Sequence, residues 1–261
     1  MNHQKLKYQQ SLKALLALEY SCVQEDFSRE DNLVTTSALH PNARAYHTQA
    51  PFFRMVTLGG NAVMTADAAI HGWLRKFSAD KPGHCLFELP NLLVLEGELN
   101  RHGYTLSETH HMFLPCGKAA PSGDFRVRWF FGDEIGQFYG DPRFPNAICD
   151  RFKPERPDII TVCAYHNEEI MGMAGCSRDA AGWQQIGIDV IPQYRGQGVG
   201  KHLVALLRNE IERRGEIPFY GTSLSNYRSW HIALACGFSP AWVEIDAKPI
   251  VLQNAVCEKI E

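Results

Sequence analysis

The feature that most constrains the fold is a glycine-rich turn between a predicted strand and an amphipathic helix. Residues 193–200 read QYRGQGVG and follow a strand predicted over 184–190. Pro192 ends this strand because proline cannot donate a ladder hydrogen bond. The helix behind the turn carries one apolar stripe, formed by Val199, Leu203, Leu206, Leu207 and Ile211. The turn is therefore expected to sit rigidly between a buried strand and a docked helix.

This turn has the chemistry of an anion site. Its glycines have no Cβ to hold a ligand away from the backbone, and the N–H groups of residues 195–200 are the unpaired donors of a helix start. A Rossmann site is disfavoured, since the spacing is Gly-x-Gly-x-Gly and the next strand, over 219–223, leads to no acidic residue. A phosphate-binding P-loop is also disfavoured, because Gly200-Lys201-His202 lacks the hydroxyl that binds magnesium.

The length of 261 residues fits two modest domains. The strongest linker signal is the Gly/Pro/Ser-rich stretch over 115–123. We therefore predict a smaller amino-terminal α/β domain over 1–115, a linker over 116–124 and a second domain over 125–261. The pair Gly103-Tyr104 echoes Gly237-Phe238, each after a predicted helix and before a strand. A degenerate duplication and a common packing solution both explain this echo.

Hydrophobic periodicity and turn residues give the coarse elements. The first domain is expected to contain a helix over 6–23, extended segments over 52–64, helices ending near Phe77 and Gly103, and a strand over 104–114. The second is expected to open with a strand over 125–131, followed by a broken helical region over 132–150 and a hairpin of strands over 158–165 and 169–176.

Composition limits the partners and the compartment. A net charge of −3 gives no general attraction for nucleic acid, and no apolar run is long enough to span a bilayer. The eight cysteines are scattered without metal-ligand spacing, and His110 and His111 are expected to point to opposite faces of a strand. We expect a cytoplasmic protein with reduced cysteines, no metal, no nucleic-acid partner and no membrane contact, and a homodimer is left open.

Arg195-x-x-Gly198-x-Gly200, with the preceding strand, Asn226 and then Gly237-Phe238, resembles the GNAT superfamily of acyl-CoA-dependent N-acyltransferases. The resemblance covers about residues 125–257. It implies a GNAT fold: a mixed central sheet with splayed strands, flanked by helices. It also implies acetyl-CoA as cosubstrate, held by Ile188, Val190, Arg195, Gly196, Gln197, Gly198, Val199, Gly200, Lys201 and Asn226.

On the catalytic side the sequence departs from the pattern that the resemblance implies. The helix position that often carries a tyrosine acid in this superfamily is Ala233 here, which cannot donate a proton. Strand alternation is expected to turn Gln184, Ile186 and Ile188 toward the substrate, and none of them titrates. Gln184, through an oriented water, and Ser229 are the remaining catalytic candidates. For each, an ordinary structural role is the competing interpretation.

The resemblance predicts an N-acetyltransferase that uses acetyl-CoA and acts on a primary amine of a small molecule. Ala233 keeps a second hypothesis open, a non-catalytic acyl-CoA-binding regulator. A protein or peptide acetyltransferase is a third, since an additional domain can form half of a peptide groove.

Overall fold

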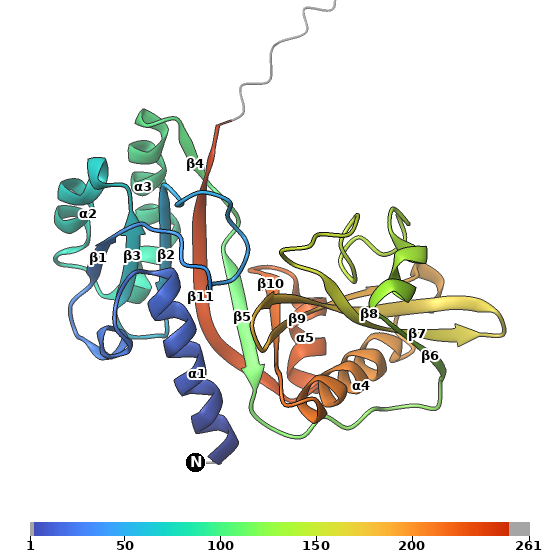
Figure 1. Cartoon of the computed structure of the whole chain (residues 1–261). Coiled ribbons are helices and arrows are strands. Elements are labelled where there is room, and N and C mark those ends of the chain that lie inside the picture. The colour runs from blue at the N-terminus through green and yellow to red at the C-terminus, as the bar shows by residue number, and fades with distance from the viewer. Residues whose placement is uncertain (1–2, 251–261) are drawn as a thin grey trace, which may run out of the picture.

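The computed structural model describes residues 3–250 (Figure 1). Its strands are β1 (Leu33–Thr36), β2 (Phe53–Thr57), β3 (Ala62–Ala66), β4 (Tyr104–Leu106), β5 (His110–Pro115), β6 (Arg126–Phe131), β7 (Asp158–His166), β8 (Glu169–Ala180), β9 (Trp183–Val190), β10 (Ile217–Ser223) and β11 (Phe238–Pro249). Its α-helices are α1 (His3–Glu19), α2 (His71–Ser78), α3 (Leu89–Arg101), α4 (Val199–Arg213) and α5 (Tyr227–Ala235). Short 3₁₀ helices are η1 (Gln24–Ser28), η2 (Ala68–Ile70), η3 (Gly83–Phe87), η4 (Gly132–Phe138) and η5 (Pro192–Tyr194).

One mixed sheet runs through the whole described chain. Its strand order is β1-β3-β2-β11-β5-β10-β9-β8-β7-β6, and β4 pairs with β11 off this path. In Figure 1 the long β11 and β5 run through the middle, with α1 to α3 on one side and α4 and α5 on the other. The expected α/β fold with a mixed sheet flanked by helices is confirmed.

Most predicted elements form, with two instructive differences. The strand expected over 104–114 is divided into β4 and β5 at residues 107–109: Ser107 still hydrogen-bonds Asp246 of β11 through its backbone and its hydroxyl, and regular pairing with β11 resumes at His110. The broken helical region over 132–150 contains η4 alone, and the rest of this region crosses the sheet without regular structure.

The strand β5 joins the two halves of the chain. It lies antiparallel between β10 and β11, and its Phe113 is fully buried beside Tyr220 and Phe238 in the core under α4. The predicted linker, residues 116–124, therefore follows a strand whose partners lie more than a hundred residues later in the chain. The division into domains stays a prediction.

A second junction is a buried network of charges. Arg44 donates to both carboxylate oxygens of Glu19, at 2.7 Å each, and to both of Glu244, at 2.9 and 2.6 Å. Arg54 lies 3.3 Å from Glu19 and donates to Asp246 at 2.8 Å. Because the side chains of Arg44, Arg54 and Glu19 are buried, the pairing of their charges determines whether the junction is stable.

Two findings bear on the expected compartment and redox state. Within residues 3–250, no helix combines the length and apolar character needed to cross a membrane. The seven cysteines among these residues are free thiols, and Cys257 lies outside the described residues.

Candidate functional site

The site is created where two neighbouring parallel strands separate. β9 and β10 pair from Trp183–Ile217 to Ile186–Tyr220, and beyond that point they are no longer partners. The end of β9 continues on β8 alone, while the end of β10 continues on β5. The splayed strands expected from the resemblance are thus present, and the gap between them exposes backbone that no neighbouring strand pairs.

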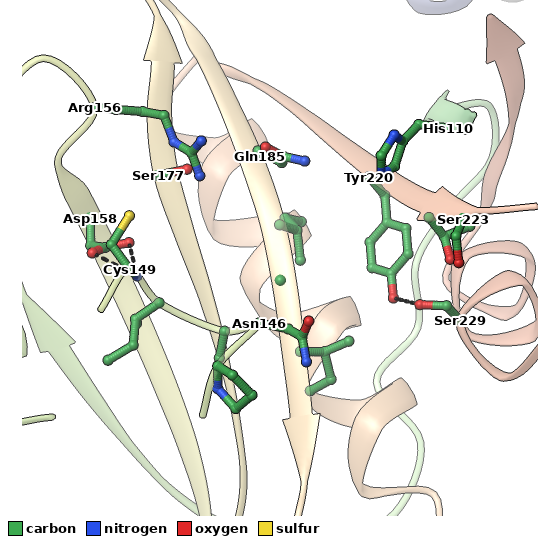
Figure 2. Close-up of a pocket in the computed structure, with 18 of the residues that line it drawn as sticks. His110, Asn146, Cys149, Arg156, Asp158, Ser177, Gln185, Tyr220, Ser223 and Ser229 are labelled. Atoms are coloured by element: carbon green, nitrogen blue, oxygen red, sulfur yellow. Dashed lines mark hydrogen bonds between the residues drawn. The ribbon is translucent and has the colours of Figure 1, made fainter. Parts of the chain in front are cut away.

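A cavity of about 560 Å³ occupies this gap (Figure 2). Ile186–Ile188 of β9 and Tyr220–Ser223 of β10 form its two sides, and Asn226 and Ser229 close it at the start of α5. The opposite end is polar, lined by Glu108, His110, Asn146, Cys149, Asp150, Lys153, Arg156, Asp158, Ser177 and Gln185. One end thus meets α5, and the other carries the ionisable side chains.

The glycine turn lies at the end of β9, before α4. Gly196 and Gly198 have positive φ values of 82° and 89°, a region that side chains rarely adopt. Within the described chain, the backbone N–H groups of residues 196–201 donate no hydrogen bond. Six unpaired donors at the positive end of a 15-residue helix form a ready anion site.

The other predicted coenzyme residues have clear places. Arg195 is exposed and donates its Nε to the carbonyl of Val190 at 3.1 Å, so it braces the turn. Gly200 lets α4 approach β9 and α5, since a Cβ there would lie 3.1 Å from Ile232 and 3.3 Å from Val190. Ile188 and Asn226 line the cavity. The coenzyme-binding role of these residues stays a prediction.

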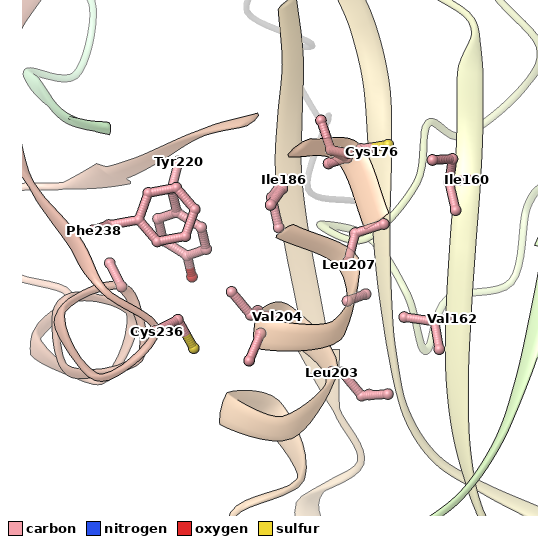
Figure 3. Close-up of a cluster of buried hydrophobic side chains, with 14 of the residues drawn as sticks. Ile160, Val162, Cys176, Ile186, Leu203, Val204, Leu207, Tyr220, Cys236 and Phe238 are labelled. Carbon is pink, nitrogen blue, oxygen red and sulfur yellow. The ribbon is translucent and has the colours of Figure 1, made fainter. Parts of the chain in front are cut away.

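At the apex of the gap, two hydroxyl groups meet. Tyr220 Oη and Ser229 Oγ share a hydrogen bond of 2.7 Å, and Asn226 caps α5 by accepting from the N–H of Ser229 at 3.2 Å. The Tyr220 ring packs in the core beside Phe238 and Val204 (Figure 3). Burial raises the pKa of Tyr220 to about 12, so the phenol is protonated at neutral pH. Tyr220 is not among the site residues predicted from the sequence. The strand predicted over 219–223 does place Tyr220 and Thr222 on one face, which was the available signal.

The two catalytic candidates from the sequence have different surroundings. Ser229 lines the cavity and contacts Tyr220. Gln184 is fully buried outside the cavity and donates to Glu216 at 2.8 Å. The physical reason is that side chains alternate along β9: Gln184 lies on the same face as Ile186, which packs in the core under α4. Its neighbour Gln185 lines the cavity instead.

The floor of the polar end is held by Asp179, which is 1% exposed. It accepts from Ser177 Oγ and Tyr46 Oη at 2.6 Å each, and Arg156 Nε lies 3.1 Å away. Burial raises the pKa of Asp179 despite these partners. Since Tyr46 comes from the amino-terminal half, that half supports the floor of the cavity as well as supplying Glu108 and His110 to its wall.

The arrangement therefore offers an anion cradle, an opened strand and a hydroxyl pair, but it offers no metal cluster. No three His, Cys, Asp or Glu side chains within residues 3–250 are grouped to hold a metal ion.

Comparison with known protein families gives a match for part of the chain. Residues 126–238 match the model of the family described as "Acetyltransferase (GNAT) family". No curated protein matches the chain.

Several solved structures align with parts of the chain. A GNAT-family acetyltransferase from Colwellia psychrerythraea is 15% identical, with 55% of this chain and 57% of that one covered and a TM-score of 0.40. A GCN5-related N-acetyltransferase from Kribbella flavida is 13% identical, with 59% and 62% covered and a TM-score of 0.44. A Salmonella typhimurium structure that contains acetyl-CoA is 15% identical, with 49% and 96% covered and a TM-score of 0.33. The chain spans less than two thirds of the first two.

Proposed function

From the match of residues 126–238 to the GNAT acetyltransferase family model, we propose that the chain is an N-acetyltransferase that transfers an acetyl group from acetyl-CoA to a primary amine of a small molecule. The observation that carries the proposal is the separation of β9 from β10 directly before a turn with six unpaired amides. A pyrophosphate fits such amides, and an extended chain fits an unpaired strand edge.

The residues present fit the coenzyme. The amides of 196–201 would hold the pyrophosphate, and the edge of residues 188–190 that faces away from β8 would hold the arm that carries the thioester. Acetyl-CoA supplies the acetyl group in activated form. A backbone N–H of this strand edge is suited to stabilise negative charge on the thioester oxygen, because it is fixed before the reaction begins.

The hydroxyl pair of Tyr220 and Ser229 suits the proton transfers that the reaction requires. The amine nitrogen forms a bond to the thioester carbon and loses one proton, the carbon–sulfur bond breaks, and the sulfur leaves with the electron pair and takes a proton from a donor that the proton lost by nitrogen restores. Tyr220, at the apex of the gap and protonated at neutral pH, is placed to give the sulfur a proton, while Ser229 orients the phenol. A proton donor is thus available although Ala233 occupies the usual helix position, which favours an enzyme over a binding regulator.

Coenzyme binding is tested by thermal unfolding. Acetyl-CoA is expected to raise the melting temperature, by mass action on the folded state. Gln197→Glu places a negative charge among the amides of the turn and is expected to reduce this shift, since Gln197 is exposed and its replacement leaves the core intact. Gln10→Glu, an exposed change on α1, is the matched control. No shift for the parent protein would contradict the proposal.

Turnover separates the enzyme from the regulator. Free thiol should be released when the protein is mixed with acetyl-CoA and a panel of putrescine, spermidine, L-lysine and a tripeptide with a free amino terminus. Binding of acetyl-CoA without thiol release from any acceptor would favour the regulator. Release with the tripeptide alone would favour a peptide acetyltransferase.

A further inference from the structure

One wall of the cavity is a segment without regular secondary structure. Residues 145–149 line the polar end, and their neighbour Phe144 anchors them in a buried cluster with Cys163 and Met173. The segment connects η4 to β7 and crosses the face of β8 and β9. Because the segment has no helix or strand hydrogen bonds of its own, contacts with other elements must determine its distance from the sheet.

Asp189 fixes it from the separated half of β9. Its carboxylate accepts from the backbone N–H of Asn146 at 2.7 Å, from Asn146 Nδ2 at 2.7 Å and from the backbone N–H of Ala147 at 2.8 Å. Hydrogen bonds to a charged acceptor are stronger than neutral ones. This one side chain thus ties the wall to the strand that borders the gap.

The sheet beneath the segment is hollowed to receive it. Gly175 of β8 and Gly187 of β9 are partners across the ladder. A Cβ on Gly187 would lie 1.8 Å from the carbonyl oxygen of Asn146, and one on Gly175 would lie 2.2 Å from that of Ala147. Real atoms never approach so closely, so any other residue at either position would push the wall away from the sheet.

The wall lies on the face of the sheet opposite α4. Cys176 and Ile186 pack with Leu203 and Leu207 under α4 (Figure 3), and they adjoin Gly175 and Gly187 in sequence. Neighbouring residues on a strand point to opposite faces, so the glycines face away from α4. Since the amide-rich turn begins α4, the wall borders the side of the gap away from the predicted coenzyme site.

We infer that Asp189 is a positioning residue for the acceptor: it sets the distance between the 145–149 wall and the separated end of β9, and thereby the fit of the amine. The inference rests on the proposed function. It does not make Asp189 a catalytic residue, because its carboxylate is already satisfied by three N–H donors of the wall.

The test uses Asp189→Asn, which keeps the shape and removes the charge, in the full chain. Asp141→Asn is the matched control, because Asp141 accepts from the backbone and guanidinium of Arg143 in the same connection but does not line the cavity. The Michaelis constant is measured for whichever of putrescine, spermidine, L-lysine or the tripeptide the parent acetylates fastest. Asp189→Asn should raise it about tenfold, while the constant for acetyl-CoA changes less than about twofold. An equal rise of the Michaelis constants for the amine and for acetyl-CoA would indicate a merely structural role and overturn the inference.

A second measurement does not depend on activity. Amide hydrogen exchange at Asn146 and Ala147 should be faster in Asp189→Asn and in Gly187→Ala than in the parent, and unchanged there in Asp141→Asn. Unchanged exchange in Asp189→Asn would overturn the inference even if the parent is active. A parent that acetylates none of the four amines would contradict the proposed function, and the exchange result alone would then decide whether Asp189 positions the wall.

Discussion

At the scale of single residues, the Tyr220–Ser229 pair gives the site its most specific chemistry. Two hydroxyls 2.7 Å apart at the apex of the gap can orient one proton, and neither depends on the helix position occupied by Ala233. Their side chains come from a strand and from the following helix, so the geometry requires both elements to be docked.

Tyr220→Phe removes the donor and keeps the ring in the core. We expect kcat to fall about tenfold to a hundredfold, at or below the lower end of the range for general acids, because a thiolate is a good leaving group. Ser229→Ala should cause a smaller fall, and Tyr227→Phe, at a side chain 70% exposed, should cause none. A steady-state assay with saturating acetyl-CoA measures this, and full activity in Tyr220→Phe would exclude the phenol as proton donor.

The buried charges predict a second residue-scale effect. Burial alone would raise the pKa of Glu19, but Arg44 and Arg54 lower it overall; the pKa of Asp246 is lowered by Arg54 and His47 in the same way. A carboxylate with a lowered pKa in the folded state stabilises it above the unfolded pKa, here near 4, and this contribution disappears as the pH falls through the folded value. The free energy of unfolding should therefore decrease as the pH falls below about 4.

Arg44→Met tests the network directly. It leaves the carboxylate of Glu19 buried with Arg54 as its remaining cation, and we expect a loss of about 3–5 kcal/mol in the free energy of unfolding at pH 7. Arg213→Met removes an exposed partner of Glu210 and should change the free energy of unfolding far less than Arg44→Met does. Urea unfolding of both variants gives the comparison. Equal effects of the two substitutions would show that the buried network is not what stabilises the junction.

At the scale of elements, local patterns predicted the turn well and the cleft poorly. The sequence over 184–200 predicts a strand, a turn and the start of a helix, and all three form. Gln184 shows the limit: the alternation of β9 could be predicted, but which face of the strand packs under α4 and which borders the cavity depends on tertiary packing. The contacts of Asp189 with Asn146 span more than forty residues and leave no local signal.

Gly198 offers a prediction for the turn as an element. It is the residue directly before α4, with φ at 89°, and a Cβ there would meet open space, so conformation is the only obstacle. Gly198→Ala should lower the free energy of unfolding by about 1–2 kcal/mol, the cost of a left-handed conformation for other residues. Lys201→Ala, in the first turn of α4, should be nearly neutral. Chemical denaturation measures the free energy of unfolding of both variants. An unchanged free energy in Gly198→Ala would mean that the turn can adopt another conformation.

At the scale of the whole molecule, the continuous sheet relates the two halves in a way that no local pattern reveals. Residues 115–123 have the composition of a linker, but Pro115 is the last residue of β5, and β5 pairs with β10 and β11. Strand pairing at this separation follows from burial of Met112, Phe113 and Leu114 against residues of the carboxy-terminal half. The sequence therefore predicted the elements on each side of β5, and tertiary packing determined how they join.

Truncation tests this organisation. A chain of residues 116–261 keeps all of the family match but lacks β5, so β10 and β11 lose the strand between them and their unpaired edges are exposed. We expect this fragment to aggregate or to unfold without a cooperative transition, and co-expression with residues 1–115 as a separate chain to restore solubility, because β5 can then pair in its native place. Cooperative thermal unfolding of the 116–261 fragment alone, with a melting temperature that acetyl-CoA raises, would instead establish it as an independent domain and confine the role of β5 to stabilisation.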